Sequence, residues 1–179
     1  MFAQGGAFGM EKTVDPAHEI GENVTITERS QLLSITPEQA KKIKSLRIEN
    51  QILDGGISFY ALFPDDNIEQ IYFNNCSFSG WDLWILSSFP SVSRIGFTRC
   101  GLRGASLKKL LNSSNPYETM ELLDLSGNNF ETPLDFVDVF KSTVFGVRSI
   151  KTLVLSDNGF GPMIVPLLQG RGGVGEVVL

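Results

Sequence analysis

The sequence predicts an α/β fold in which short parallel strands alternate with helical connections along a repeating chain. Three observations lead to this prediction. Five segments align without gaps, they recur at nearly regular intervals, and apolar residues at helical spacing lie between them. The chain has 179 residues, of which 42% are hydrophobic and 20% charged, a composition typical of an ordered protein with one core.

The five segments share the pattern apolar-x-x-apolar-x-apolar-x-x-(N/C/Q)-x-apolar. They are IKSLRIENQIL from Ile43, IEQIYFNNCSF from Ile68, VSRIGFTRCGL from Val92, MELLDLSGNNF from Met120 and IKTLVLSDNGF from Ile150. The first residue of each central apolar pair falls at Leu46, Ile71, Ile95, Leu123 and Leu153, which gives intervals of 25, 24, 28 and 30 residues.

In these segments the chain resembles the leucine-rich-repeat family, whose signature is L-x-x-L-x-L-x-x-N/C-x-L, and the last two segments match it closely. The resemblance implies a solenoid shaped as a right-handed horseshoe arc. Its parallel sheet would line the concave side and its helices the convex side, as in the ribonuclease-inhibitor-like branch of the family.

Side chains alternate along a strand, so the two faces of each segment have different roles. Leu46 and Ile48 are expected to point into the core, while Ser45, Arg47 and Glu49 point to the opposite side. The same alternation in the other four segments predicts one apolar face and one open face.

The N/C/Q position of the pattern, here called the rung, turns inward after the strand. An amide there bonds backbone groups that the turn leaves unpaired, and stacked copies form a ladder. Asn128 and Asn158 fit this role, whereas Gln51 departs from the family pattern. Cys76 and Cys100 occupy the same position and are predicted to be buried and inert. A disulfide between these two is geometrically conceivable, but a reducing compartment is the simpler assumption.

The connections between the segments carry apolar residues at helical spacing, which predicts core-facing ridges. The stretch LDFVDVFKSTVF is expected to be a full helix, while WDLWILSS and MIVPLLQ are expected to be shorter. Gly80 and Gly104 suit the sharp turn out of a strand. The ridge residues are Leu83, Leu86, Phe89, Leu107, Leu110, Leu111, Leu134, Val137 and Phe140.

The ends of the chain predict three parts: a flexible leader over 1–22, an N-terminal cap segment over 23–42, and the repeats over 43–179. Val24 and Ile26 suggest a degenerate first strand, followed by a helix that starts after Thr36. A sixth strand begins at Val177 and is truncated in mid-repeat. Its exposed edge favours end-to-end self-association.

The open face of the predicted sheet is the candidate partner-binding surface. Outward strand positions stack about 4.8 Å apart there, and a parallel sheet left open on one face is suited to recognition. Leu122 and Val154 form either an apolar patch or two scattered surface residues. The candidate residues are Arg47, Glu49, Gln70, Tyr72, Asn74, Arg94, Thr98, Leu122, Asp124, Thr152, Val154 and Ser156.

Tyr72, flanked by Arg47 and Arg94, has the composition of an interface hot spot, because an aromatic ring and guanidinium groups lose little freedom on binding. The alternative interpretation is structural. In that case Tyr72 fills the space over Gly96, and the arginines pair with acidic neighbours. Those neighbours would be Glu49 and Asp124.

Catalysis, a cofactor and a metal site are not predicted. His18 is the only histidine, and it lies in the leader, which disfavours a histidine-dependent triad. The segment GRGGVG at 170–175 satisfies G-x-G-x-x-G, but it precedes a strand instead of following one, so a flexible connection is favoured. Asp135 and Asp138 are interpreted as a solvated helix face.

The net charge of −5 and pI near 4.9 disfavour nucleic-acid and membrane partners, which need a basic surface. No membrane span or signal segment is predicted, so a cytoplasmic location is expected. Glycosylation sequons at Asn23, Asn75 and Asn112 keep a secreted alternative open.

The function that these observations favour is a non-enzymatic scaffold that binds an unidentified protein partner, as part of a larger regulatory or cytoskeletal protein. Two alternatives remain. One is a regulator or inhibitor of an enzyme such as a small GTPase, which rests on fold resemblance alone. The other is a secreted or surface receptor fragment.

Overall fold

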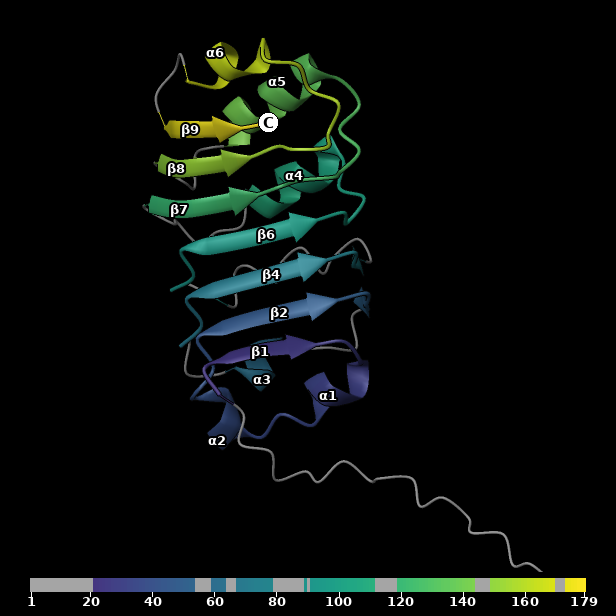
Figure 1. Ribbon diagram of the computed structural model, residues 1–179, viewed down its shortest axis with the longest axis vertical. Helices are drawn as coiled ribbons and strands as arrows, with labels where there is room; N and C mark the ends of the chain where they lie inside the picture. The colour runs from purple at the N-terminus through teal and green to yellow at the C-terminus, as the bar shows by residue number, and fades with distance from the viewer. Residues whose placement is uncertain are drawn as a thin grey trace, which may run out of the picture.

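The computed structural model describes residues 21–53, 59–63, 67–78, 89, 91–111, 119–143, 149–169 and 173–179. Its centre is a seven-stranded sheet in which every neighbouring pair is parallel (Figure 1). The strands follow one another in chain order. They are β1 (Asn23–Ile26), β2 (Ser45–Glu49), β4 (Gln70–Asn74), β6 (Arg94–Thr98), β7 (Thr119–Asp124), β8 (Ser149–Val154) and β9 (Val174–Val178).

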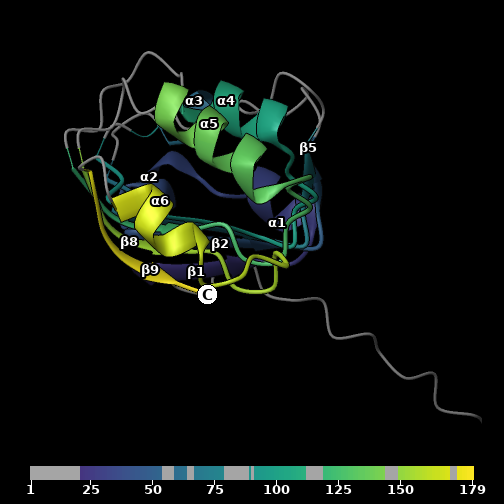
Figure 2. The ribbon, with the colours of Figure 1, turned by 90° about the horizontal axis from the view of Figure 1, so that it is seen from above.

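Helices and a second, small sheet lie in the connections. Figure 2 shows α3, α4 and α5 together on one side of the large sheet. The small sheet pairs β3 (Ile52–Leu53) with β5 (Ser77–Phe78). The helices are α1 (Arg29–Leu33), α2 (Pro37–Ala40), α3 (Phe59–Leu62), α4 (Gly104–Leu111), α5 (Pro133–Thr143) and α6 (Ile164–Gln169). Among the described helices, none has the length and apolar character needed to cross a membrane.

The register of the large sheet aligns the five sequence segments as their pattern predicts. Leu46 pairs with Ile71, Ile71 with Ile95, Ile95 with Leu123, and Leu123 with Leu153, and all five side chains are fully buried. The core therefore lies between the sheet and its connections.

The last strand starts earlier than the sequence pattern indicates. Val177 is the register partner of Leu153, as the repeat interval predicts, but β9 already begins at Val174 opposite Ile150. The three extra residues were missed because Gly175 and Glu176 lack the apolar side chains that mark a strand.

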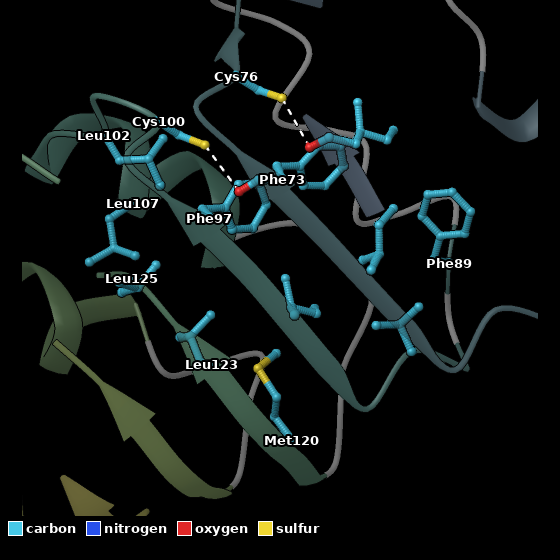
Figure 3. Packing of buried hydrophobic residues seen from close by; sticks show 14 of the residues in the cluster. Phe73, Cys76, Phe89, Phe97, Cys100, Leu102, Leu107, Met120, Leu123 and Leu125 are labelled. Carbon is cyan, nitrogen blue, oxygen red and sulfur yellow. Dashed lines mark hydrogen bonds between the residues drawn. The ribbon is translucent and has the colours of Figure 1, made fainter. Parts of the chain in front are cut away.

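Aromatic side chains fill the middle of the core. Phe73 and Phe97 come from neighbouring strands and stack with ring centroids 5.1 Å apart (Figure 3). Phe59 and Phe89 pack edge-on at 5.9 Å. The predicted burial of Phe89 and Leu107 is confirmed.

The helix α5 confirms the predicted long connection, but one of its expected core residues is wrong. Leu134 is 66% exposed, while Phe136, Val137 and Phe140 are buried. Each helical residue advances by about 100°, so Leu134 lies roughly 110° from the centre of the stripe formed by these three residues. Its apolar character alone suggested burial.

The predicted N-terminal segment contains β1 and α2 as expected, and the helix α1, which was not predicted, lies between them in the chain. Thr36 caps α2: its hydroxyl accepts a hydrogen bond from the Gln39 N–H at 3.3 Å, and the Gln39 side chain accepts one from the Thr36 N–H at 2.9 Å. This confirms the predicted capping box.

Several sequence predictions fall outside the described residues. These are the leader up to residue 20 with His18, the ridge residues Leu83 and Leu86, Gly80, the sequon at Asn112, and Gly170 and Gly172. The side chains of Leu110 and Leu111 are also outside the description, although their backbone belongs to α4.

Candidate functional site: the open face of the sheet

Each of the five central strands is followed by a residue with left-handed backbone, directly before the rung. These residues are Asn50, Asn75, Arg99, Gly127 and Asp157, with φ between 52° and 66°. Two residues separate each rung from the buried residue before it, so simple strand alternation would point the rung side chain outward. The left-handed residue reverses the alternation, and the rung side chain points inward instead. The predicted turn glycine Gly104 is not used in this way, because it is the first residue of α4.

The rung residue Asn128 is buried and fully hydrogen-bonded. Its side-chain amide donates to the carbonyls of Phe97 at 2.6 Å and Leu125 at 2.7 Å, and its side-chain oxygen accepts from the N–H groups of Cys100 and Leu102 at 3.1 and 3.0 Å. One side chain thus satisfies backbone groups of two successive connections.

The other rungs repeat this bonding. Asn158 donates to Leu125, and its side-chain oxygen accepts from the N–H of Asn128. Gln51, the residue that departs from the family pattern, still donates to the Thr27 carbonyl at 2.6 Å. The predicted ladder is therefore confirmed, including the position where the sequence deviates.

Cys76 and Cys100 serve as rungs with free, buried thiols. Cys76 donates to the Ile48 carbonyl at 3.3 Å and Cys100 to the Phe73 carbonyl at 3.4 Å, as the dashed lines in Figure 3 indicate. Burial raises the pKa of the Cys100 thiol to about 12 and that of Cys76 in the same direction. Because the thiolate is the reactive form, these thiols are poor nucleophiles in the folded protein.

The twelve candidate binding residues share one side of the sheet and none of them is buried. Arg47 and Arg94 are exposed, and the other ten are partly buried. The ladder therefore presents these side chains from a sheet whose opposite face is held by a packed core. Leu122 and Val154 are partly buried on β7 and β8, and both flank Asp124.

Tyr72 is the centre of the N-terminal half of this face. Its ring covers Gly96 on the next strand, as the structural alternative predicts, and Gly96 is therefore buried. The Arg47 guanidinium lies 5.2 Å from the ring centroid. Burial raises the pKa of Tyr72, while the positive charges of Arg94 and Arg47 oppose that rise.

The arginines pair only partly as the structural alternative predicts. Arg47 lies 3.9 Å from Glu49, a long contact between partly exposed groups. Arg94 does not pair with Asp124: its Nε donates to Glu121 at 3.0 Å. Lys151 also reaches Glu121 at 3.6 Å, and the hydrogen bond from Arg94, followed by the charge of Lys151, lowers the Glu121 pKa.

The sequence reasoning missed the left-handed residues as part of the open face. The Asn75 side chain donates to the Asn50 side chain at 2.8 Å, and the exposed Arg99 lies across Gly127 in the turn after β7. A signal was available: a polar residue or glycine stands directly before every rung. These are the residue types that best tolerate a positive φ, apart from Arg99.

The described residues of the open face offer hydrogen-bonding and charged groups. Among the described residues, no three His, Cys, Asp or Glu side chains gather in a way that could hold a metal ion. Asp135, one of the pair interpreted as a solvated face, is bonded by the Thr132 hydroxyl at 2.7 Å at the start of α5.

Comparison of the chain with protein-family models, curated proteins and solved structures found no significant match.

Proposed function

We propose that this chain is a leucine-rich-repeat solenoid whose open, concave sheet face binds a segment of a protein partner, as a module of a larger regulatory or cytoskeletal protein. The repeated rung bonding supports the repeat assignment. Gln51, Cys76, Cys100, Asn128 and Asn158 all donate to a backbone carbonyl of the preceding segment.

The observation that carries the binding function is the uncovered parallel sheet. Parallel sheets are normally covered on both faces, and their strands are apolar throughout. Here the strands have the alternating pattern of a one-sided sheet, as in β4, where Ile71 and Phe73 are buried and Gln70, Tyr72 and Asn74 are not. Polar side chains occupy this face at five successive strands, as a recognition surface requires.

Rigidity makes this face suited to binding. The strand ends are held by buried hydrogen bonds, and Tyr72 is already fixed between Gly96 and Arg47. A partner that docks on fixed side chains does not have to immobilise them, so less of the contact energy is lost to ordering.

A reducing location, the cytoplasm, is part of this proposal. Cys76 and Cys100 are free, and both thiols donate hydrogen bonds to carbonyls. Oxidation would remove these thiol donors from the buried ladder.

Comparative capture from a native extract tests the proposal. The wild type is compared with Tyr72→Ala/Arg94→Ala on the open face and with the control Arg103→Ala/Leu134→Ala, which changes exposed residues in the connections. We expect proteins that the wild type and the control retain but the open-face variant loses. Equal capture by all three would reject the open face as the binding surface.

A further inference from the structure

Charges on the open face are separated along the sheet. We count the outward strand positions together with the left-handed residue that follows each strand. Over β2, β4 and β6 these positions hold three arginines and one acid; over β7, β8 and β9 they hold three acids and, among the described residues, no lysine or arginine. The first group is Arg47, Arg94, Arg99 and Glu49, and the second is Asp124, Asp157 and Glu176.

Arg47 and Arg94 flank Tyr72, Arg99 lies in the turn after β6, and all three are available to a ligand. Arg99 is exposed and pairs with no carboxylate among the described residues. Arg47 is only loosely paired, at 3.9 Å from Glu49. Arg94 shares Glu121 with Lys151, so the Glu121 carboxylate keeps a cationic partner when Arg94 turns to a ligand.

The negative charges of the acidic half are less neutralised by nearby cations than the positive charges of the basic half are by nearby acids. Asp124 accepts hydrogen bonds from the backbone N–H of Ser126 at 2.9 Å and from its hydroxyl, both of which are neutral donors. Arg94 and Lys151, on the two neighbouring strands, both contact Glu121 instead. Asp124, Asp157 and Glu176 therefore retain their negative field.

Distance separates the outer ends of the two halves, although the halves meet between β6 and β7, where Gly96 pairs with Asp124. Strands lie about 4.8 Å apart, so β2 with Arg47 and β9 with Glu176 are roughly 24 Å apart. Salt screens exposed charges over about 8 Å at physiological ionic strength. A bound segment thus meets a locally basic surface at one end of the face, although the whole chain carries a net charge of −5.

We propose, on the basis of the proposed function, that the partner is a protein segment with an acidic stretch. This stretch docks across β2, β4 and β6, beside Tyr72. The neutral or basic remainder of the segment lies across β7 to β9. Guanidinium groups bind carboxylates through paired hydrogen bonds, and the reverse orientation would place like charges against each other. The charge separation therefore sets the direction in which the segment lies.

Selection of random displayed peptides on the full chain tests this proposal. Peptides that bind the wild type but not Tyr72→Ala or Ser45→Trp are taken as open-face binders; the second variant adds bulk without removing packing. Each is then measured by fluorescence anisotropy against Arg47→Gln/Arg94→Gln/Arg99→Gln. The control Lys41→Gln/Lys42→Gln/Arg103→Gln removes the same charge outside the open face.

We expect open-face binders to be enriched in Asp and Glu, with affinity about tenfold weaker for the arginine variant and changed by less than about twofold in the control. Open-face binders without acidic enrichment, or with unchanged affinity, would overturn the acidic segment and leave the proposed function standing. If no binder is sensitive to Tyr72→Ala or Ser45→Trp, the proposed function itself fails. A wild-type dimer that the arginine variant abolishes would identify a second copy of the chain as the occupant and also overturn the proposal.

Discussion

Tyr72 lies flat across Gly96 of the neighbouring strand, so closely that a Cβ atom at position 96 would stand 2.5 Å from the ring carbon Cδ1. The absence of a side chain at Gly96 thus leaves room for the Tyr72 ring. Arg99 and Gly127 repeat the relationship one strand further along, where a Cβ at 127 would stand 2.7 Å from Cγ of Arg99. On this face a large side chain is twice accommodated by a glycine in the next segment.

The substitution Gly96→Ala is expected to displace Tyr72 without unfolding the protein. Position 96 has no positive φ, so alanine fits the backbone, and its better strand entropy offsets part of the clash. We expect the free energy of unfolding to change by less than about 1 kcal/mol, while affinity for open-face ligands falls. Unchanged affinity in peptide titrations would contradict a role for the fixed ring.

The rung residue Asn128 is expected to be one of the most sensitive polar positions. Asn128→Ala removes the bonds to Phe97 and Leu125 and leaves two buried N–H groups without their acceptor. We expect a loss of about 3 kcal/mol in the free energy of unfolding, measured by denaturant titration. The adjacent, exposed Asn129→Ala serves as the control and should cost less than about 0.5 kcal/mol.

The corrected orientation of α5 can be checked with a matched pair. Phe136→Ala empties a buried position and is expected to cost about 3–5 kcal/mol. Leu134→Ala removes a 66% exposed side chain two residues away and is expected to cost less than about 0.5 kcal/mol. Comparable losses in the two variants would show that Leu134 belongs to the core after all.

The buried thiol of Cys100 makes stability depend on alkaline pH. Its pKa rises from 9.0 to about 12 on folding, so the unfolded state releases the proton first. The stabilisation is fully present below pH 9.0 and is lost as pH rises towards 12. In denaturant titrations, the free energy of unfolding of the wild type should therefore fall relative to that of Cys100→Ala as pH rises through this window. A constant difference would contradict the raised pKa.

The outer edge of β9 predicts self-association of this chain. β9 is the last strand of the sheet order, and Val178 is exposed on it. Unpaired strand edges bind one another, and a lysine on the edge discourages this. We expect the mass measured by light scattering to rise with concentration for wild type and to stay monomeric for Val178→Lys. A wild type that stays monomeric throughout would refute the edge contact.

The repeat register could be predicted from the sequence because it depends on apolar periodicity alone. Leu46, Ile71, Ile95, Leu123 and Leu153 lie side by side in the structure as their spacing indicates. The position of Leu134 could not be predicted, because burial on a helix depends on where the helix starts, and hydrophobic character does not reveal that phase.

The composition of the open face was likewise predictable, but its pairing was not. Alternation places Arg47, Tyr72 and Arg94 on one side, whereas the choice of Glu121 over Asp124 by Arg94 depends on side-chain reach. The position of Tyr72 over Gly96 could be predicted, because alternation places both residues on the open face of neighbouring strands.

The direction of the ladder has a consequence for synthesis on the ribosome. Each rung side chain reaches back to the preceding segment, as Asn158 does to Leu125 and Asn128 does to Phe97. A newly synthesised segment therefore lacks the rung donors for these carbonyls until the next segment has left the exit tunnel. During synthesis, each segment that emerges therefore completes the hydrogen bonding of the segment before it.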